Sequence, residues 1–122
     1  MSANRILVVD DDPRIVRLFK VILEGGGYPV ITASSGTEAL EILHAETVGL
    51  VVLDLSMPEP DGFEVLKYIR SSAPGLRVLV VSGFMKGALL EAAECLGADA
   101  TLDKTDAPDL LLSSVNSLMK WS

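Results

Sequence analysis

The sequence predicts an α/β protein with a single doubly wound (βα)5 domain, in which five strands alternate with five helices. Short apolar runs, each ended by polar or turn residues, alternate with longer segments whose apolar residues recur at helical spacing. Strict alternation predicts parallel strands joined by right-handed crossovers, with helices on both faces of the sheet. The 122 residues contain no linker-like or low-complexity segment, so residues 1–122 are expected to form one domain.

Composition sets the class of protein. With 49% hydrophobic and only 5% aromatic residues, the core must be aliphatic, and a net charge of −7 argues against a nucleic-acid-binding face. The single cysteine, Cys95, cannot form an internal disulfide and is interpreted as a small buried hydrophobe in a reducing compartment. No secretory signal and no membrane-spanning run is found, so we expect a soluble, cytoplasmic protein.

The first strand and helix are predicted from Arg5–Val9 and the residues that follow it. Asp12 is a favourable N-cap, and Pro13 suits a first helical turn. Gly25–Gly27 ends this helix. Because the glycine triplet follows a helix and not a strand, it indicates a C-cap and not a phosphate-binding loop.

The second strand, Tyr28–Ala33, carries Pro29 near its start, which predicts a position at the edge of the sheet. The sequence Ser35–Glu38 is typical of a capping box and predicts the start of the second helix. His44, near the end of that helix, is interpreted as a partner of the helix dipole. With no second histidine in the chain, a catalytic or metal-binding role for it is not expected.

The second half of the chain continues the same alternation. Four apolar residues lead directly to Asp54, so this carboxylate is expected where a buried central strand opens to solvent. The predicted elements are strand Gly49–Leu53, helix Pro60–Ser72, strand Leu76–Val81, helix Gly87–Leu96, strand Ala98–Leu102 and a helix that Asp106 caps and that runs to about Lys120.

Polar side chains gather at the ends of four of these strands. Asp10 and Asp11 follow the first strand, Asp54 the third, Ser82 the fourth and Lys104 the fifth. Since the carboxyl ends of parallel strands share one edge of the sheet, these side chains are expected to converge. Three close carboxylates repel one another, and either a hard cation or a lysine relieves that repulsion.

This group of residues indicates phosphoryl chemistry. Oxygen-only ligands select Mg²⁺ or Mn²⁺, and Mg²⁺ keeps several waters, so few protein ligands are needed. A carboxylate beside Mg²⁺ is a nucleophile toward phosphorus. In phosphoryl transfer the protein mainly positions groups and neutralises charge, for which a lysine and a hydroxyl are suited.

The sequence resembles a two-component response-regulator receiver domain (CheY-like) in four separate motifs, which are VVDDDP, VVLDLSMPEPDG, VVSG and a lysine after GADATLD. The resemblance implies a flavodoxin-like strand order, 2-1-3-4-5. It implies that Asp54 accepts a phosphoryl group from a sensor histidine kinase or phosphotransfer protein. Asp10, Asp11, Asp54 and the backbone carbonyl of Ser56 would bind the metal, and Ser82 and Lys104 would contact the phosphoryl group.

The chain departs from this family in two places. Lys104 precedes Thr105, whereas the family usually has a lysine-proline pair with a cis peptide bond. A cis bond before a residue other than proline costs about 2.5–4 kcal/mol, so we predict a trans bond and a reshaped loop. Thr101 stands where the family usually has an aromatic switch residue. We therefore expect the face formed by the fourth helix, fifth strand and fifth helix to signal weakly or by another route.

The sequence leaves two classes of function open. The leading interpretation is a phosphoryl-accepting switch without enzymatic turnover beyond autodephosphorylation, and the alternative is a phosphorylation-independent interaction module with the same fold. An aspartate-dependent phosphatase is disfavoured because Ser56 stands where that class needs a second aspartate. The face formed by the fourth helix, fifth strand and fifth helix is either an ordinary apolar core stripe or a surface that binds a partner or a second copy of the chain. Its candidate residues are Leu89, Leu90, Leu110, Leu111, Leu112 and Trp121.

Overall fold

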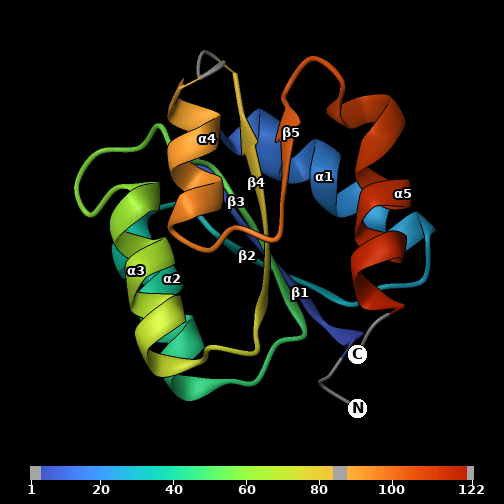
Figure 1. The fold of residues 1–122 in the computed structure, drawn as a ribbon. Helices are drawn as coiled ribbons and strands as arrows, with labels where there is room; N and C mark the ends of the chain where they lie inside the picture. The colour runs from blue at the N-terminus through green and yellow to red at the C-terminus, as the bar shows by residue number, and fades with distance from the viewer. Residues whose placement is uncertain (1–3, 84–87, 121–122) are drawn as a thin grey trace.

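The computed structural model describes residues 4–83 and 88–120, and these form five strands and five helices in strict alternation (Figure 1). The predicted α/β class is confirmed. The elements are β1 (Ile6–Val9), α1 (Pro13–Gly25), β2 (Val30–Ala33), α2 (Gly36–Ala45), β3 (Leu50–Leu53), α3 (Gly62–Ser72), β4 (Arg77–Ser82), α4 (Ala88–Cys95), β5 (Ala100–Asp103) and α5 (Ala107–Met119).

All neighbouring strands are parallel, and their order is β2-β1-β3-β4-β5, as the family resemblance implied. β2 lies at one edge, as Pro29 predicted. β3 is central, and none of its four side chains, Leu50–Leu53, is more than 1% exposed. Burying each such side chain stabilises the fold by about 1.5–3 kcal/mol. The strand that precedes Asp54 is therefore firmly fixed in the sheet.

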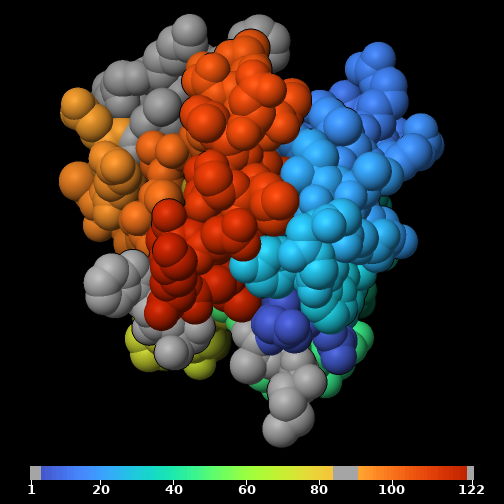
Figure 2. Space-filling model, turned by 90° about the vertical axis from the view of Figure 1, so that its right-hand side faces the viewer, coloured from blue at the N-terminus to red at the C-terminus, as the bar shows by residue number. Residues whose placement is uncertain are grey.

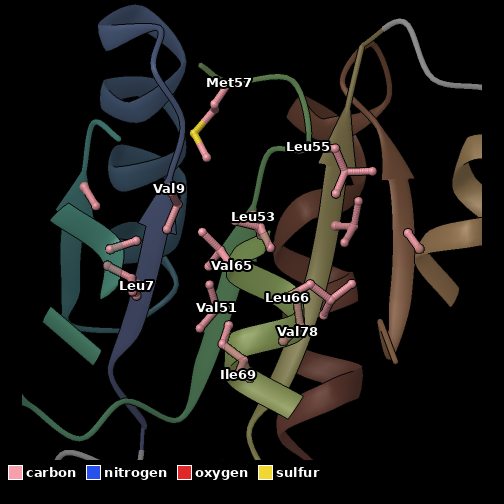
Figure 3. Close-up of a cluster of buried hydrophobic side chains, with 14 of the residues drawn as sticks. Leu7, Val9, Val51, Leu53, Leu55, Met57, Val65, Leu66, Ile69 and Val78 are labelled. Carbon is pink, nitrogen blue, oxygen red and sulfur yellow. The ribbon is translucent and has the colours of Figure 1, made fainter. Parts of the chain in front are cut away.

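Helices cover both faces of the sheet, which produces two separate cores. On one face α2, α3 and α4 pack on alternate residues of the strands, so that Val65 and Ile69 of α3 share a core with Leu53 of β3 (Figure 3). On the other face the core contains side chains of α1 and α5, such as Phe19 and Leu111. Figure 2 shows α1 and α5 side by side on the surface of that second face. Within the described residues, none of the helices has the length and apolar character that a membrane crossing requires.

Helix α3 begins at Gly62, two residues later than predicted, because Asp61 is its N-cap. The Asp61 side chain accepts the backbone N–H of Glu64 at 3.0 Å, and the Glu64 carboxylate accepts the N–H of Asp61 at 3.3 Å. This reciprocal pair is a complete capping box. It stabilises the first turn of the helix that follows the Asp54 loop.

Other helix ends are confirmed in position. Asp12 caps α1 by accepting the N–H of Arg14, and the glycine triplet ends α1 as predicted. The box predicted for α2 forms only in half, because Ser35 accepts the N–H of Glu38 while the Glu38 carboxylate accepts the N–H of Ser34. Asp106 occupies the N-cap position of α5, but its side chain makes no capping hydrogen bond.

Two strands begin two residues later than predicted, at Val30 and Ala100, and the residues at which the predictions started, Tyr28 and Ala98, belong to the preceding turn. The N–H of Tyr28 donates to the carbonyl of Leu23 in α1, and the N–H of Ala98 donates to the carbonyl of Ala93 in α4. These donors close helix ends and are not available to the sheet. Apolar residues here pack on the core without joining a strand.

Cys95 is exposed at the end of α4, so its interpretation as a buried hydrophobe is wrong. Ala93 is the fully buried residue of this helix turn. Residues two apart in a helix lie on nearly opposite sides, which turns Cys95 away from the sheet. The side chains of Leu89 and Leu90, and all of Trp121, lie outside the described residues.

Two glycines allow helices to approach the loop after β3 closely. A Cβ on Gly62 would lie 2.2 Å from the carbonyl oxygen of Asp54, and one on Gly36 would lie 2.1 Å from the carbonyl oxygen of Pro60. Side chains at either position would collide with backbone, which cannot yield as a flexible side chain can. Because glycine has no side chain, the loop after Asp54 can lie directly against the helix starts at Gly36 and Gly62.

Gly62→Ala should lower the free energy of unfolding by about 1–3 kcal/mol, because overpacking against backbone outweighs the better helix propensity of alanine. Urea unfolding measures this. Gly75→Ala is the matched control, since a Cβ there meets nothing within 4 Å. Equal stability of the Gly62 and Gly75 variants would contradict the close-approach argument.

Candidate functional site

The side chains predicted to converge do lie at one edge of the sheet, where the strands end in the upper part of Figure 1. Asp10 and Asp11 follow β1, Asp54 follows β3, Ser82 is the last residue of β4, and Lys104 follows β5. The ladder continues just past β1 and β3, because Asp54 donates its N–H to the carbonyl of Val9 at 3.0 Å. Asp10 and Asp54 thus lie at the ends of two neighbouring strands, β1 and β3.

The three aspartates form a compact acidic cluster. One carboxylate oxygen from each of Asp10, Asp11 and Asp54 lies within 4.8 Å of the others. Asp10 and Asp54 are each 2% exposed, whereas Asp11 is exposed to solvent. The cluster therefore has a buried floor and an open side from which a cation or a substrate can approach.

Lys104 lies across the two buried carboxylates. Its Nζ is 2.9 Å from Asp10 Oδ2 and 3.5 Å from Asp54 Oδ2. The first contact is within hydrogen-bond distance, and the second is a longer ion pair. The sequence predicted that this lysine joins the cluster, but not that Asp10 is its nearer partner.

Charge and burial shift two pKa values in this cluster. Burial, together with the charge of Asp10, raises the pKa of Asp54 to about 6, although Lys104 and the N–H of Ser56 act in the opposite direction. Burial acts to lower the pKa of Lys104, but its bond to Asp10 and the charge of Asp54 outweigh this and raise that pKa. Lys104 is therefore the charged group that balances the buried acids at neutral pH.

Backbone hydrogen bonds orient the two buried carboxylates. Asp54 Oδ1 accepts the N–H of Ser56 at 3.2 Å, and Asp10 Oδ1 accepts the N–H of Asp12 at 2.9 Å. Among the described residues, Asp54 Oδ2 and the Ser82 hydroxyl are buried without a hydrogen bond. Buried polar atoms normally have partners, so these two are suited to contact a bound group.

The remaining candidates from the sequence are placed as follows. Asp12 is a helix cap whose side chain also pairs with Arg14 and is not among the three clustered carboxylates. His44 is exposed in the last turn of α2, at the other end of that helix from its Ser35 cap, and lies outside the cluster. Thr101 is half-buried in β5 opposite Val80, so no aromatic ring occupies that position.

The peptide bond between Lys104 and Thr105 is trans, as predicted, and the cis bond found among the described residues is Glu59–Pro60. Sequence reasoning missed the role of Asp103, whose carboxylate accepts hydrogen bonds from both the N–H and the hydroxyl of Thr105. An aspartate two residues before a threonine is a common turn pattern, and could have indicated it.

Comparison with known proteins agrees with this geometry. Residues 6–116 match the family model of the response regulator receiver domain. The chain is 38% identical over 123 residues to the alkaline phosphatase synthesis transcriptional regulatory protein PhoP of Bacillus subtilis (strain 168), covering 98% of this chain and 50% of that protein. It is 34% identical over 117 residues to the transcriptional regulatory protein GlrR of Escherichia coli (strain K12), covering 96% and 26%.

A solved structure gives the same match over the whole fold. The response regulator receiver domain protein (CheY-like) from Methanospirillum hungatei JF-1 superimposes with a TM-score of 0.91 at 32% identity, covering 98% of this chain and 96% of that chain. The chain belongs to the response regulator receiver domain family, whose members are signalling phosphoacceptors and not catalytic enzymes. It spans about a quarter to a half of the length of the two curated relatives.

The raised pKa of Asp54 predicts a pH-dependent stability. The folded chain holds this proton up to a pKa of about 6, above the ordinary pKa of 3.8 that applies when the chain is unfolded. The free energy of unfolding should therefore fall as the pH rises between these values, by up to about 3 kcal/mol from this group. Asp54→Asn cannot titrate, so without metal it should be more stable than the wild type near neutral pH and lose that advantage at about pH 4. Urea unfolding at both pH values measures this, and an equal advantage at both would contradict it.

Proposed function

We propose that Asp54 accepts a phosphoryl group from a phosphohistidine of a partner histidine kinase or phosphotransfer protein, and that residues 1–122 act as one receiver domain. The observation that carries this proposal is the buried Asp54 carboxylate, one oxygen of which has no hydrogen bond within the described part of the chain and lies beside a cationic lysine. A nucleophilic oxygen needs a free lone pair, and the developing charge on the phosphoryl oxygens needs nearby cations.

The donor set supports Mg²⁺ as the resident cation, with Mn²⁺ as a substitute. Asp10, Asp11, Asp54 and the backbone carbonyl of Ser56 would hold it, since all are hard oxygen ligands. The short separation of the three carboxylates and their exposed side at Asp11 fit a cation that keeps several waters. When bound, Mg²⁺ would neutralise charge on both the carboxylates and the phosphoryl oxygens.

The residues of this chain have distinct parts in the transfer. The free Asp54 oxygen forms a bond to phosphorus while the bond from phosphorus to the donor imidazole nitrogen breaks. Lys104 compensates the negative charge of the phosphoryl oxygens, and the Ser82 hydroxyl, which has no hydrogen bond to the described residues, donates one to a phosphoryl oxygen. Hydrolysis of the acyl phosphate then returns Asp54 to its carboxylate.

The output of the switch is proposed to lie outside this domain. The curated relatives are transcriptional regulatory proteins, and the matched part is about a quarter to a half of their length. We infer that phosphorylation of Asp54 changes a contact made by the receiver, either with another part of a longer chain or with a second protein. This domain itself is not proposed to bind nucleic acid.

Incubation with a small acyl phosphate and Mg²⁺ should add one phosphoryl group, seen by intact mass spectrometry as a base-labile and acid-stable adduct. Asp54→Asn should abolish it. Asp12→Asn is the matched control, because asparagine caps a helix as well as aspartate and the adduct should persist. No adduct on the wild type with any small donor would favour the phosphorylation-independent module over the proposed switch.

Asp11→Asn should weaken Mg²⁺ binding at least about tenfold, since even removal of a group behind a metal ligand costs that much. Asp11 is exposed, so the variant should fold normally. Isothermal titration with MgCl₂ measures the affinity, with Asp12→Asn again as the control. Unchanged affinity in the Asp11 variant would show that the cation binds elsewhere.

We also propose a homodimer through α4, β5 and α5. Among the side chains that the structure describes on this face, two large apolar ones are partly exposed, Leu96 directly after α4 at 37% and Leu110 on α5 at 46%. Leu110→Ser should lower the dimer fraction measured by light scattering in the presence of Mg²⁺ and the phosphoryl mimic beryllofluoride. Val21→Ser, on α1 and 64% exposed, is the matched control. A monomeric wild type under these conditions would contradict the dimer alone.

A further inference from the structure

The loop between β5 and α5 is held by a polar pair, Asp103 and Thr105, which we name the Asp103–Thr105 clasp. Asp103 Oδ1 accepts the N–H of Thr105 at 2.9 Å and its hydroxyl at 2.8 Å. The carbonyl of Asp103 also accepts the N–H of Asp106 at 2.9 Å, which closes a four-residue turn. Hydrogen bonds thus fix a turn that a lysine-proline pair would fix by its ring.

Lys104 is a central residue of that turn. Its N–H donates to the carbonyl of Ser82 at 3.1 Å, and its own carbonyl accepts the N–H of Ala107 at 3.3 Å. The lysine stem runs past Gly83, where an added Cβ would lie 3.5 Å from Lys104 Cδ. Backbone bonds on both sides, and the clasp around it, therefore determine where the side chain starts.

A lysine side chain is long and flexible, so the direction of its stem decides which acceptor its ammonium group meets. Here the stem brings Nζ to 2.9 Å from Asp10 and 3.5 Å from Asp54. In the hydrogen bonds that define it, the clasp contacts neither Asp10 nor Asp54. These bonds therefore act on the site through the backbone of Lys104, which lies between the two clasp residues.

We propose that the Asp103–Thr105 clasp positions Lys104 for contact with the phosphoryl group on Asp54. Asp103 and Thr105 are then positioning residues, and the hydroxyl of Thr105 is the part of the pair that a substitution can remove without changing shape. This inference rests on the proposed function of Asp54 and Lys104. It explains how the chain keeps the lysine in place with a trans bond before Thr105.

The affinity for beryllofluoride at a fixed MgCl₂ concentration, measured by ¹⁹F NMR, tests this proposal. Thr105→Val keeps the shape but loses one hydrogen bond, and should weaken the affinity roughly threefold to tenfold. Thr105→Ser keeps the hydroxyl and should restore it. Asp103→Ala loses both bonds and should have the largest effect. Thr47→Val, an exposed threonine between α2 and β3, should leave the affinity unchanged.

The comparison of valine with serine at position 105 decides the outcome even if the Asp103 variant fails to fold. A wild-type affinity in Thr105→Val, or an equal loss in the valine and serine variants, would overturn the clasp while leaving Asp54 as the phosphoacceptor. A wild type that binds no beryllofluoride and takes no phosphoryl group would overturn the proposed function and the clasp together.

Discussion

The repulsion between two buried carboxylates, Asp10 and Asp54, is the interaction on which the rest of the site depends. β1 and β3 are neighbours in the sheet, so the residues that follow them are forced together. Lys104 compensates this charge from the end of β5, two strands away from β3. Removing the cationic partner of a buried ion pair is strongly destabilising, so sheet order, the acidic cluster and the lysine constrain one another.

The rest of the fold keeps this arrangement rigid. β3 is buried on both faces, and Gly62 and Gly36 allow helix ends to contact the backbone of the loop that follows it. Within the described residues, Asp54 Oδ2 and the Ser82 hydroxyl remain without hydrogen bonds, at a cost of about 1–3 kcal/mol for each such buried group. A phosphoryl group that satisfies them recovers part of this cost, which makes the site complementary to its proposed ligand.

Much of this could be predicted from the sequence, because strand ends are readable from apolar runs and parallel topology collects those ends at one edge. Asp10, Asp54, Ser82 and Lys104 were all found in this way. The nearer pairing of Lys104 with Asp10 depends on loop geometry that no spacing encodes. The exposure of Cys95 depends on which side of a short helix faces the sheet, and the Asp103 bonds depend on a turn whose pattern is common in loops. The consequence of Thr101 for signalling stays a prediction.

The most direct measurement of the central claim is a crystal structure of the chain with Mg²⁺ and beryllofluoride. We expect beryllium bonded to a carboxylate oxygen of Asp54, with Lys104 Nζ donating to a fluoride. In that state the lysine would have exchanged its bond to Asp10 for one to the phosphoryl mimic. A mimic bound at another carboxylate, or a lysine still bonded to Asp10 with no contact to the mimic, would contradict it.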